Sequence, residues 1–106
     1  GIGRISRQSY RLGMGYKLVV KPEAERDLLD ALAWYEEQKS GLDTELYIEI
    51  SNLLDDITLH PEHFQERYRN VRIRFTRKFK YGVHYTIERK TVYVHAIFHT
   101  SRMPRK

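Results

Sequence analysis

The side chains that could carry out chemistry are cations and a histidine in the last third of the chain. Arg72, Arg74 and Lys80 alternate with apolar residues, and His99 closes the final alternating run. If these four side chains lie in one row of a sheet, the histidine could act as general acid and base in phosphodiester cleavage, and the cations could stabilise the phosphate transition state. The alternative role for His99, which we favour, is a hydrogen bond to backbone that anchors the C-terminal tail.

Three further residues are candidates for contacting a macromolecular target or a nucleic acid. His84 lies opposite the apolar residues of its run, and Arg102 adds a charge close to the C-terminus. Tyr93 is predicted to point outward, where its ring could stack on a base. Tyr81 and Tyr85 share the apolar face of their run, so we expect them in the core.

The histidines are poorly placed for a metal ion. His95 and His99 stand four residues apart on one predicted strand, which separates them by roughly 13 Å. His60 and His63 flank Pro61 and have no third ligand nearby in sequence. The chain has no cysteine, and it carries no phosphate-binding glycine loop, zinc signature or serine nucleophile elbow. We therefore expect neither a metal nor a cofactor.

Charge divides the chain sharply, although the formal net charge is only +5. Residues 22–66 contain 13 acidic and 2 basic residues, whereas residues 67–106 contain 12 basic residues and 1 acid. The first 21 residues add 5 positive charges. Such a division indicates two faces with different partners or an acidic layer that compensates a basic one. The residual positive charge favours an anionic partner.

The elements that position these residues follow from apolar periodicity. A chain of 106 residues has the length of one domain with one core. Tyr16–Lys21 alternates with period two, which predicts a strand with one buried face. Apolar residues recur at three- and four-residue spacings over Glu23–Lys39 and again over Leu42–His60, which predicts two amphipathic helices. The break at Ser40–Gly41 is so short that the helices should form an antiparallel hairpin.

Three more alternating runs follow a polar connection through Asn70. They predict a three-stranded antiparallel meander, so the fold class is α+β in the order β-α-α-β-β-β. The residues expected to point inward are Val71, Ile73, Phe75, Phe79, Tyr81, Val83, Tyr85, Ile87, Val92, Val94, Ala96 and Phe98.

The register of the meander follows if these apolar faces coincide. The first loop is then Thr76–Lys78, and the second has two or four residues, such as Arg89–Lys90. The cross-strand pairs are His84 with His95, Lys80 with His99, Arg74 with Lys80, and Arg72 with Gly82. One outward row would read Arg74, Lys80 and His99. Because like charges opposite one another are destabilising, this row is either solvated or held for an anionic ligand, and we favour the ligand.

The beginning of the chain is expected to be foreign to the domain. Residues 1–13 are rich in glycine and arginine without clear periodicity and precede Met14. We interpret them as an expression remnant or an upstream segment, with one domain over residues 14–106. No apolar run approaches the length of a membrane span or a signal peptide, so a cytoplasmic protein is expected.

Several stretches of the chain follow one another in an order and spacing that a known protein family shares: Tyr16–Leu28, Trp34–Glu36, Gly41–Leu42, Phe79–Tyr85 and Val94–Pro104. Together they resemble the RelE/ParE family of toxins from bacterial type II toxin–antitoxin systems, over essentially all of residues 16–104. The ending, with His99, Arg102 and Pro104, is similar to that of ParE-like (plasmid stabilisation) members.

The resemblance implies a small α+β toxin that is neutralised when an antitoxin wraps a helix or an extended segment around it. ParE-like members poison DNA gyrase, whereas RelE-like members cleave messenger RNA on the ribosome with basic residues on the sheet. Arg72 and Arg74 match the second-strand cations of the ribonucleases. The third-strand arginine position holds Gly82 instead, although Lys80 or His84 could supply charge from adjacent positions.

We therefore predict a cytoplasmic bacterial toxin that binds a cognate antitoxin and DNA gyrase, as a dimer or a toxin–antitoxin hetero-oligomer, without a cofactor, a metal or a membrane. The alternatives are a ribosome-dependent mRNA endoribonuclease that uses Arg72, Arg74, Lys80 and His99, and a non-toxic family member that only binds a partner. The residues predicted to contact the target or nucleic acid are Arg72, Arg74, Lys80, His84, Tyr93, His99 and Arg102.

Overall fold

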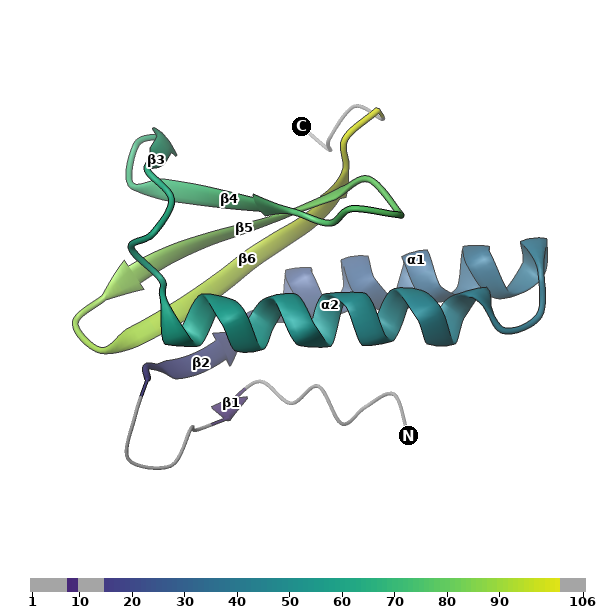
Figure 1. Cartoon of the computed structure of the whole chain (residues 1–106), viewed down its shortest axis with the longest axis horizontal. Coiled ribbons are helices and arrows are strands. Elements are labelled where there is room, and N and C mark those ends of the chain that lie inside the picture. Colours follow the sequence, from purple (N-terminus) through teal and green to yellow (C-terminus); the bar gives the residue numbers. More distant parts are fainter. Residues whose placement is uncertain (1–7, 10–14, 102–106) are drawn as a thin grey trace.

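The structure is a computed structural model that describes residues 8–9 and 15–101. Two helices pack side by side against one six-stranded sheet (Figure 1). The elements are β1 (Gln8–Ser9), β2 (Lys17–Val20), α1 (Pro22–Gln38), α2 (Leu42–Leu59), β3 (Glu66–Tyr68), β4 (Val71–Phe75), β5 (Tyr81–Glu88) and β6 (Thr91–His99). The α+β class and the order of the principal elements are confirmed.

The strands follow the order β1-β2-β6-β5-β4-β3 across the sheet. β2 runs parallel to β6, and every other neighbouring pair is antiparallel. Two short edge strands, β1 and β3, were not predicted, because runs of two and three residues are too short to show an alternation.

Except for Gln8–Ser9, the segment predicted to be foreign lies outside the described residues. Arg102 also lies outside them. The predictions about this segment and about Arg102 stay predictions.

The helices begin and end almost where their periodicity predicts. Pro22 opens α1, where its missing N–H costs nothing, and Glu23 and Glu25 complement the positive end of the helix dipole. Gly41 connects α1 to α2 with a φ of 94°, a left-handed conformation that glycine adopts without steric cost. The connection is only a few residues long, so the two helices run antiparallel, as predicted.

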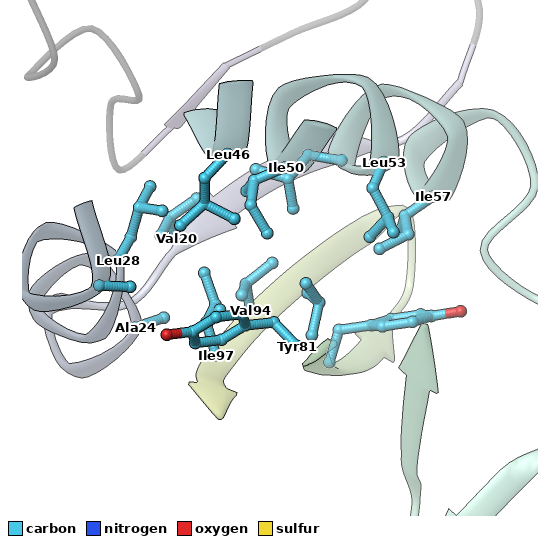
Figure 2. Close-up of a cluster of buried hydrophobic side chains, with 14 of the residues drawn as sticks. Val20, Ala24, Leu28, Leu46, Ile50, Leu53, Ile57, Tyr81, Val94 and Ile97 are labelled. Carbon is cyan, nitrogen blue, oxygen red and sulfur yellow. The ribbon is translucent and has the colours of Figure 1, made fainter. Parts of the chain in front are cut away.

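The core lies between the helices and one face of the sheet (Figure 2). Each fully buried large aliphatic or aromatic side chain stabilises the fold by roughly 1.5–3 kcal/mol. Tyr85 is completely buried, and its hydroxyl donates a hydrogen bond of 2.8 Å to the carbonyl oxygen of Pro61. The apolar members of this core include Val20, Ala24, Leu28, Leu46, Ile50, Ile57, Tyr81, Val83, Val92, Val94 and Ile97.

The predicted register of β5 and β6 is correct near their turn and wrong beyond a β-bulge. Glu88 pairs with Thr91 across the predicted two-residue loop, but His84 pairs with Ala96 rather than with His95. His95 is the extra residue of the bulge, and it shifts everything after it by one position. The predicted pair of Lys80 with His99 is therefore replaced by Tyr81 with His99.

The predicted register of β4 and β5 is also wrong, and the error inverts β4. Arg72 pairs with Tyr85 rather than with Gly82, and Arg74 pairs with Val83 rather than with Lys80. The loop is longer than predicted because Thr76 pairs with Tyr81: its N–H donates 2.8 Å to the Tyr81 carbonyl, and its hydroxyl accepts 2.7 Å from the Tyr81 N–H. This longer loop turns both arginines toward the helix-covered face.

Candidate functional site

The predicted cation row of Arg74, Lys80 and His99 does not form. Arg74 lies over the helix-covered face, where its guanidinium Nη1 bonds Asp56 of α2 at 2.7 Å. Its carbon Cζ also stands 4.5 Å from the centre of the Phe64 ring, a cation–π contact. These contacts hold Arg74 against α2 and away from any row that Lys80 could join.

Arg72 is held in a similar way. Its Nε donates a hydrogen bond of 2.6 Å to the carbonyl oxygen of Phe64, and its Nη2 lies 3.9 Å from Glu66. Arg72 therefore fastens the connection between α2 and β3. Two of the four residues predicted for ribonuclease chemistry, Arg72 and Arg74, are therefore engaged by neighbouring groups of the protein itself.

His99 contacts the core side of the sheet. Its ring meets the buried Tyr81 edge-on, with centroids 5.1 Å apart. Its Nδ1 accepts a hydrogen bond of 3.1 Å from the backbone N–H of Ser101. The bulge at His95 explains the change of face, because one extra residue reverses the side on which later side chains point. These contacts fit the tail-anchoring role that we favoured.

Lys80 stands in a strained backbone conformation at the start of β5. Its φ is 61°, a left-handed region that costs a non-glycine residue roughly 1–2 kcal/mol. Phe79 and Tyr81 on either side are both buried, and both rings pack against Tyr35 with centroids 5.1 and 6.3 Å from it. Phe79 and Tyr81 thus enter the core on either side of Lys80, whose own side chain remains exposed.

The opposite face of the sheet carries His84, which was predicted to point outward, beside apolar and aromatic side chains that were predicted to lie in the core or were not considered. We call them the open-face cluster: Tyr68, Ile73, Phe75, His84 and Phe98. Register places Ile73 opposite His84, and Phe98 opposite Gly82. Within the described part of the chain, neither helix packs on this face (Figure 1).

The rings of the open-face cluster contact one another. The Tyr68 hydroxyl lies 3.1 Å from Nδ1 of His84, and the His84 ring meets that of Phe98 edge-on at 5.2 Å between centroids. Phe75 leans over Gly82: a β-carbon added to that glycine would lie 3.3 Å from the Phe75 ring. The space beside the third-strand position that lacks an arginine is therefore filled by the side chains of Ile73 and Phe75.

The charge of the open-face cluster is low at its centre. Burial lowers the pKa of His84 below its ordinary value, and the nearby Asp27 only partly opposes this shift. Charge stands at the margin, where Arg67 places its guanidinium carbon 5.6 Å from the centre of the Phe75 ring. Tyr93, predicted as a base-stacking residue, instead has the Lys21 ammonium 5.9 Å from its ring centre.

His95 lies on the same face but away from the cluster. Its Nε2 is 2.8 Å from the Thr86 hydroxyl. Burial, and then the neighbouring charge of Lys21, lowers its pKa, while Glu23 acts in the opposite direction. Both histidines on this face therefore favour the neutral form, which disfavours a phosphate-binding role.

A groove runs between α2 and the β4–β5 loop and encloses about 570 Å³. Its acidic residues have partners: Lys78 forms an ion pair with Glu45, Arg74 forms one with Asp56, and Glu49 accepts hydrogen bonds from the backbone N–H groups of Arg77 and Lys78. The bond from Lys78 lowers the pKa of Glu45. Ile48 on one wall is 52% exposed, so the groove presents apolar surface between neutralised ion pairs.

Residues 8–9 and 15–101 contain neither a metal-binding cluster nor a membrane-spanning helix. No three histidine or acidic side chains in that part gather where they could hold a metal ion. None of its helices is both long and apolar enough to span a membrane.

Comparison with known proteins identifies the family. Residues 18–104 match the family model described as the ParE toxin of the type II toxin–antitoxin system parDE. The chain belongs to the ParE toxin family. A solved structure described as the chromosomal ParDE TA system from P. aeruginosa superposes with a TM-score of 0.70 and 13% sequence identity, over 81% of this chain and 95% of that one. No curated protein sequence matched.

The ParE family match and the shared fold confirm the resemblance seen in the sequence. At 13% identity the ParDE neighbour shows the fold alone. The functional surfaces of this ParE-family chain therefore have to be inferred from its own residues. The surfaces available are the open-face cluster, the α2 groove and the exposed cations at their margins.

Proposed function

We propose that this ParE-family chain is a toxin that a cognate antitoxin neutralises and that acts by binding DNA gyrase. The observation that carries the choice of binding over RNA cleavage is the inverted β4. Arg72 and Arg74 are engaged by Phe64, Glu66 and Asp56 on the helix-covered side. A nuclease of the predicted kind needs those cations free to stabilise charge that develops on a phosphate.

The remaining features also favour a binding function. The open-face cluster is aromatic and apolar, with neutral histidine at its centre, and large exposed apolar surfaces mark interaction sites. Bacterial cytoplasm, where gyrase acts, is the location that this proposal requires. A dimer or a toxin–antitoxin hetero-oligomer is the assembly that it implies.

An alternative function is ribosome-dependent mRNA cleavage. The observation in its favour is the Tyr68–His84 pair, with its 3.1 Å contact on the uncovered face. A histidine beside a tyrosine could move a proton during phosphodiester cleavage. The lowered pKa of His84 and the absence of a cation at Gly82 weigh against this function.

Controlled expression in a bacterium tests the toxin proposal. Induction of residues 14–106 should arrest growth, and co-expression of the protein encoded by the neighbouring reading frame should restore it. Normal growth with abundant soluble protein would contradict both the gyrase and the ribonuclease function, and would leave the non-toxic partner-binding protein as the surviving alternative.

A further inference from the structure

The apolar residues of β4 face the wrong way for an isolated domain. The side of a sheet that faces water normally alternates with the core side and carries polar residues. Here Ile73 and Phe75 occupy the uncovered side while Arg72 and Arg74 occupy the covered side. The Phe75 side chain is 46% exposed, and Tyr68 is 49% exposed. This inversion is a local conflict of the kind that accompanies a functional surface.

We propose that the open-face cluster is the docking surface for an apolar segment of the antitoxin that carries acidic residues at its flanks. This inference rests on the proposed toxin–antitoxin function and names the surface by which the partner is held. Apolar side chains of the segment cover Phe75 and Phe98, and its acidic residues approach the cations at the margin.

Charge at the margin selects the acidic flanks. The Arg67 guanidinium stands over the Phe75 ring at 5.6 Å and would meet a carboxylate without leaving that ring. Lys80, immediately before β5 and next to the closing residues of β6, is exposed. Within the described residues its ammonium has no ion-pair partner. Carboxylates placed on these two cations would steer the segment and fix its register.

The centre of the face selects a protein segment over RNA. Nucleic acids bind chiefly through phosphates that meet Lys and Arg, but the central residues Ile73, Phe98 and His84 carry no charge when the histidine is neutral. Burial lowers the pKa of His84 and so favours that neutral form. A surface with an uncharged centre binds apolar side chains more favourably than it binds a phosphodiester backbone.

The cluster is continuous with the α2 groove, because Phe75 lines that groove together with Ile48. The carboxylates in the groove already have partners: Glu45 pairs with Lys78, and Glu49 accepts hydrogen bonds from backbone N–H groups. A segment that crosses the open face can therefore continue over Phe75 into the groove with further apolar contacts. Phe75 occupies the centre of this path, where the residues that dominate binding usually lie.

The test measures binding of purified variants to the purified product of the neighbouring antitoxin reading frame by titration calorimetry. Phe75→Glu should weaken the complex by about 30-fold or more, and Arg67→Glu by about 10-fold. The matched control is Leu29→Glu on α1, since Leu29 is also 46% exposed, and it should change the affinity by no more than about twofold. Circular dichroism melts of all three variants check that they fold, and Arg67→Glu alters no core contact.

Three outcomes would overturn the docking surface. A wild-type complex that tolerates Phe75→Glu and Arg67→Glu, or that is lost with Leu29→Glu instead, would reject the surface and leave the proposed function intact. A labelled single-stranded RNA that binds wild type and loses affinity with Phe75→Glu, while the antitoxin complex is unchanged, would assign the face to RNA. If wild type forms no complex at all, the proposed function fails, and the docking surface fails with it.

Discussion

The carboxylate of Asp27 on α1 accepts a hydrogen bond of 2.9 Å from the backbone N–H of Ile97 on β6. Asp27 is only 7% exposed, and Ile97 follows the bulge at His95 that shifts the register of β6 against β5. Ile97 then points into the core, Phe98 joins the open-face cluster, and His99 meets Tyr81. One buried carboxylate on a helix thus supports the change of face along the last strand.

Removal of that carboxylate should loosen the bulge. Asp27→Ala leaves the buried N–H of Ile97 without this acceptor, so the free energy of unfolding should fall by about 1–3 kcal/mol in urea titrations. Asp27→Asn keeps an acceptor oxygen and should lose less. Hydrogen exchange of the Ile97 amide should accelerate in Asp27→Ala. The exposed Asp30→Asn on the same helix is the control, and equal effects at both positions would refute a specific role for Asp27.

The ion pair of Arg74 with Asp56 should stabilise the inverted β4. The Arg74 side chain is 16% exposed and that of Asp56 is 49% exposed, so the pair is partly shielded from solvent. A double-mutant cycle with Arg74→Gln and Asp56→Asn should give a coupling energy of roughly 1 kcal/mol that decreases in high salt. The more exposed pair of Lys78 with Glu45 should show a smaller coupling. A coupling near zero for Arg74 would mean that this arginine is free for another role.

The strain at Lys80 predicts a substitution that stabilises the protein. Lys80→Gly removes the steric cost of a φ of 61°, partly offset by the greater freedom of glycine in the unfolded chain. The free energy of unfolding should rise by about 0.5–1 kcal/mol. Arg77→Gly, in the same loop but without a positive φ, should lower it. If Lys80→Gly also lowers stability, the left-handed conformation is not the cost that we assign to it.

Acidification should destabilise the fold through the open-face histidines. The folded state lowers the pKa of both His84 and His95 below the ordinary value of 6.5. Between the lowered and the ordinary pKa, the unfolded chain binds more protons than the folded one. The contribution of these histidines to the free energy of unfolding is therefore complete above about pH 6.5 and decreases as pH falls.

The measurement for this pH dependence is a set of urea titrations from about pH 7.5 down to about pH 5. His84→Gln and His95→Gln should each flatten the dependence, and the double variant should flatten it further. A pH profile as steep as that of the wild type in all three variants would contradict the assignment.

The helices, the first long strand and the order of the meander could be predicted from the sequence, because apolar spacing reports directly on burial. The faces of β4 and of the end of β6 could not. A bulge at His95 and a loop lengthened by Thr76 each shift the register by an odd number of residues, and apolar alternation looks the same before and after such a shift. The assumption that all apolar residues face the core also fails where the uncovered face is itself apolar, as at Ile73 and Phe75.

The same error explains why the predicted cation row does not form. The cation row depended on an outward β4, so its members dispersed when β4 inverted, while Tyr68 and Phe98 were not considered as surface residues. A useful signal was present: Val71, Ile73 and Phe75 alternate with two arginines that have acidic partners available on α2 and β3. Alternation alone could not tell which set is covered.

The most direct test of the central claim combines two assays on the purified chain. In a gyrase supercoiling assay, we expect the chain to inhibit the enzyme and the antitoxin to restore its activity. In a parallel assay with translating ribosomes, we expect the message to remain intact at the same concentration of chain. Codon-positioned cleavage of the ribosome-bound message, with gyrase activity unaffected, would contradict the account.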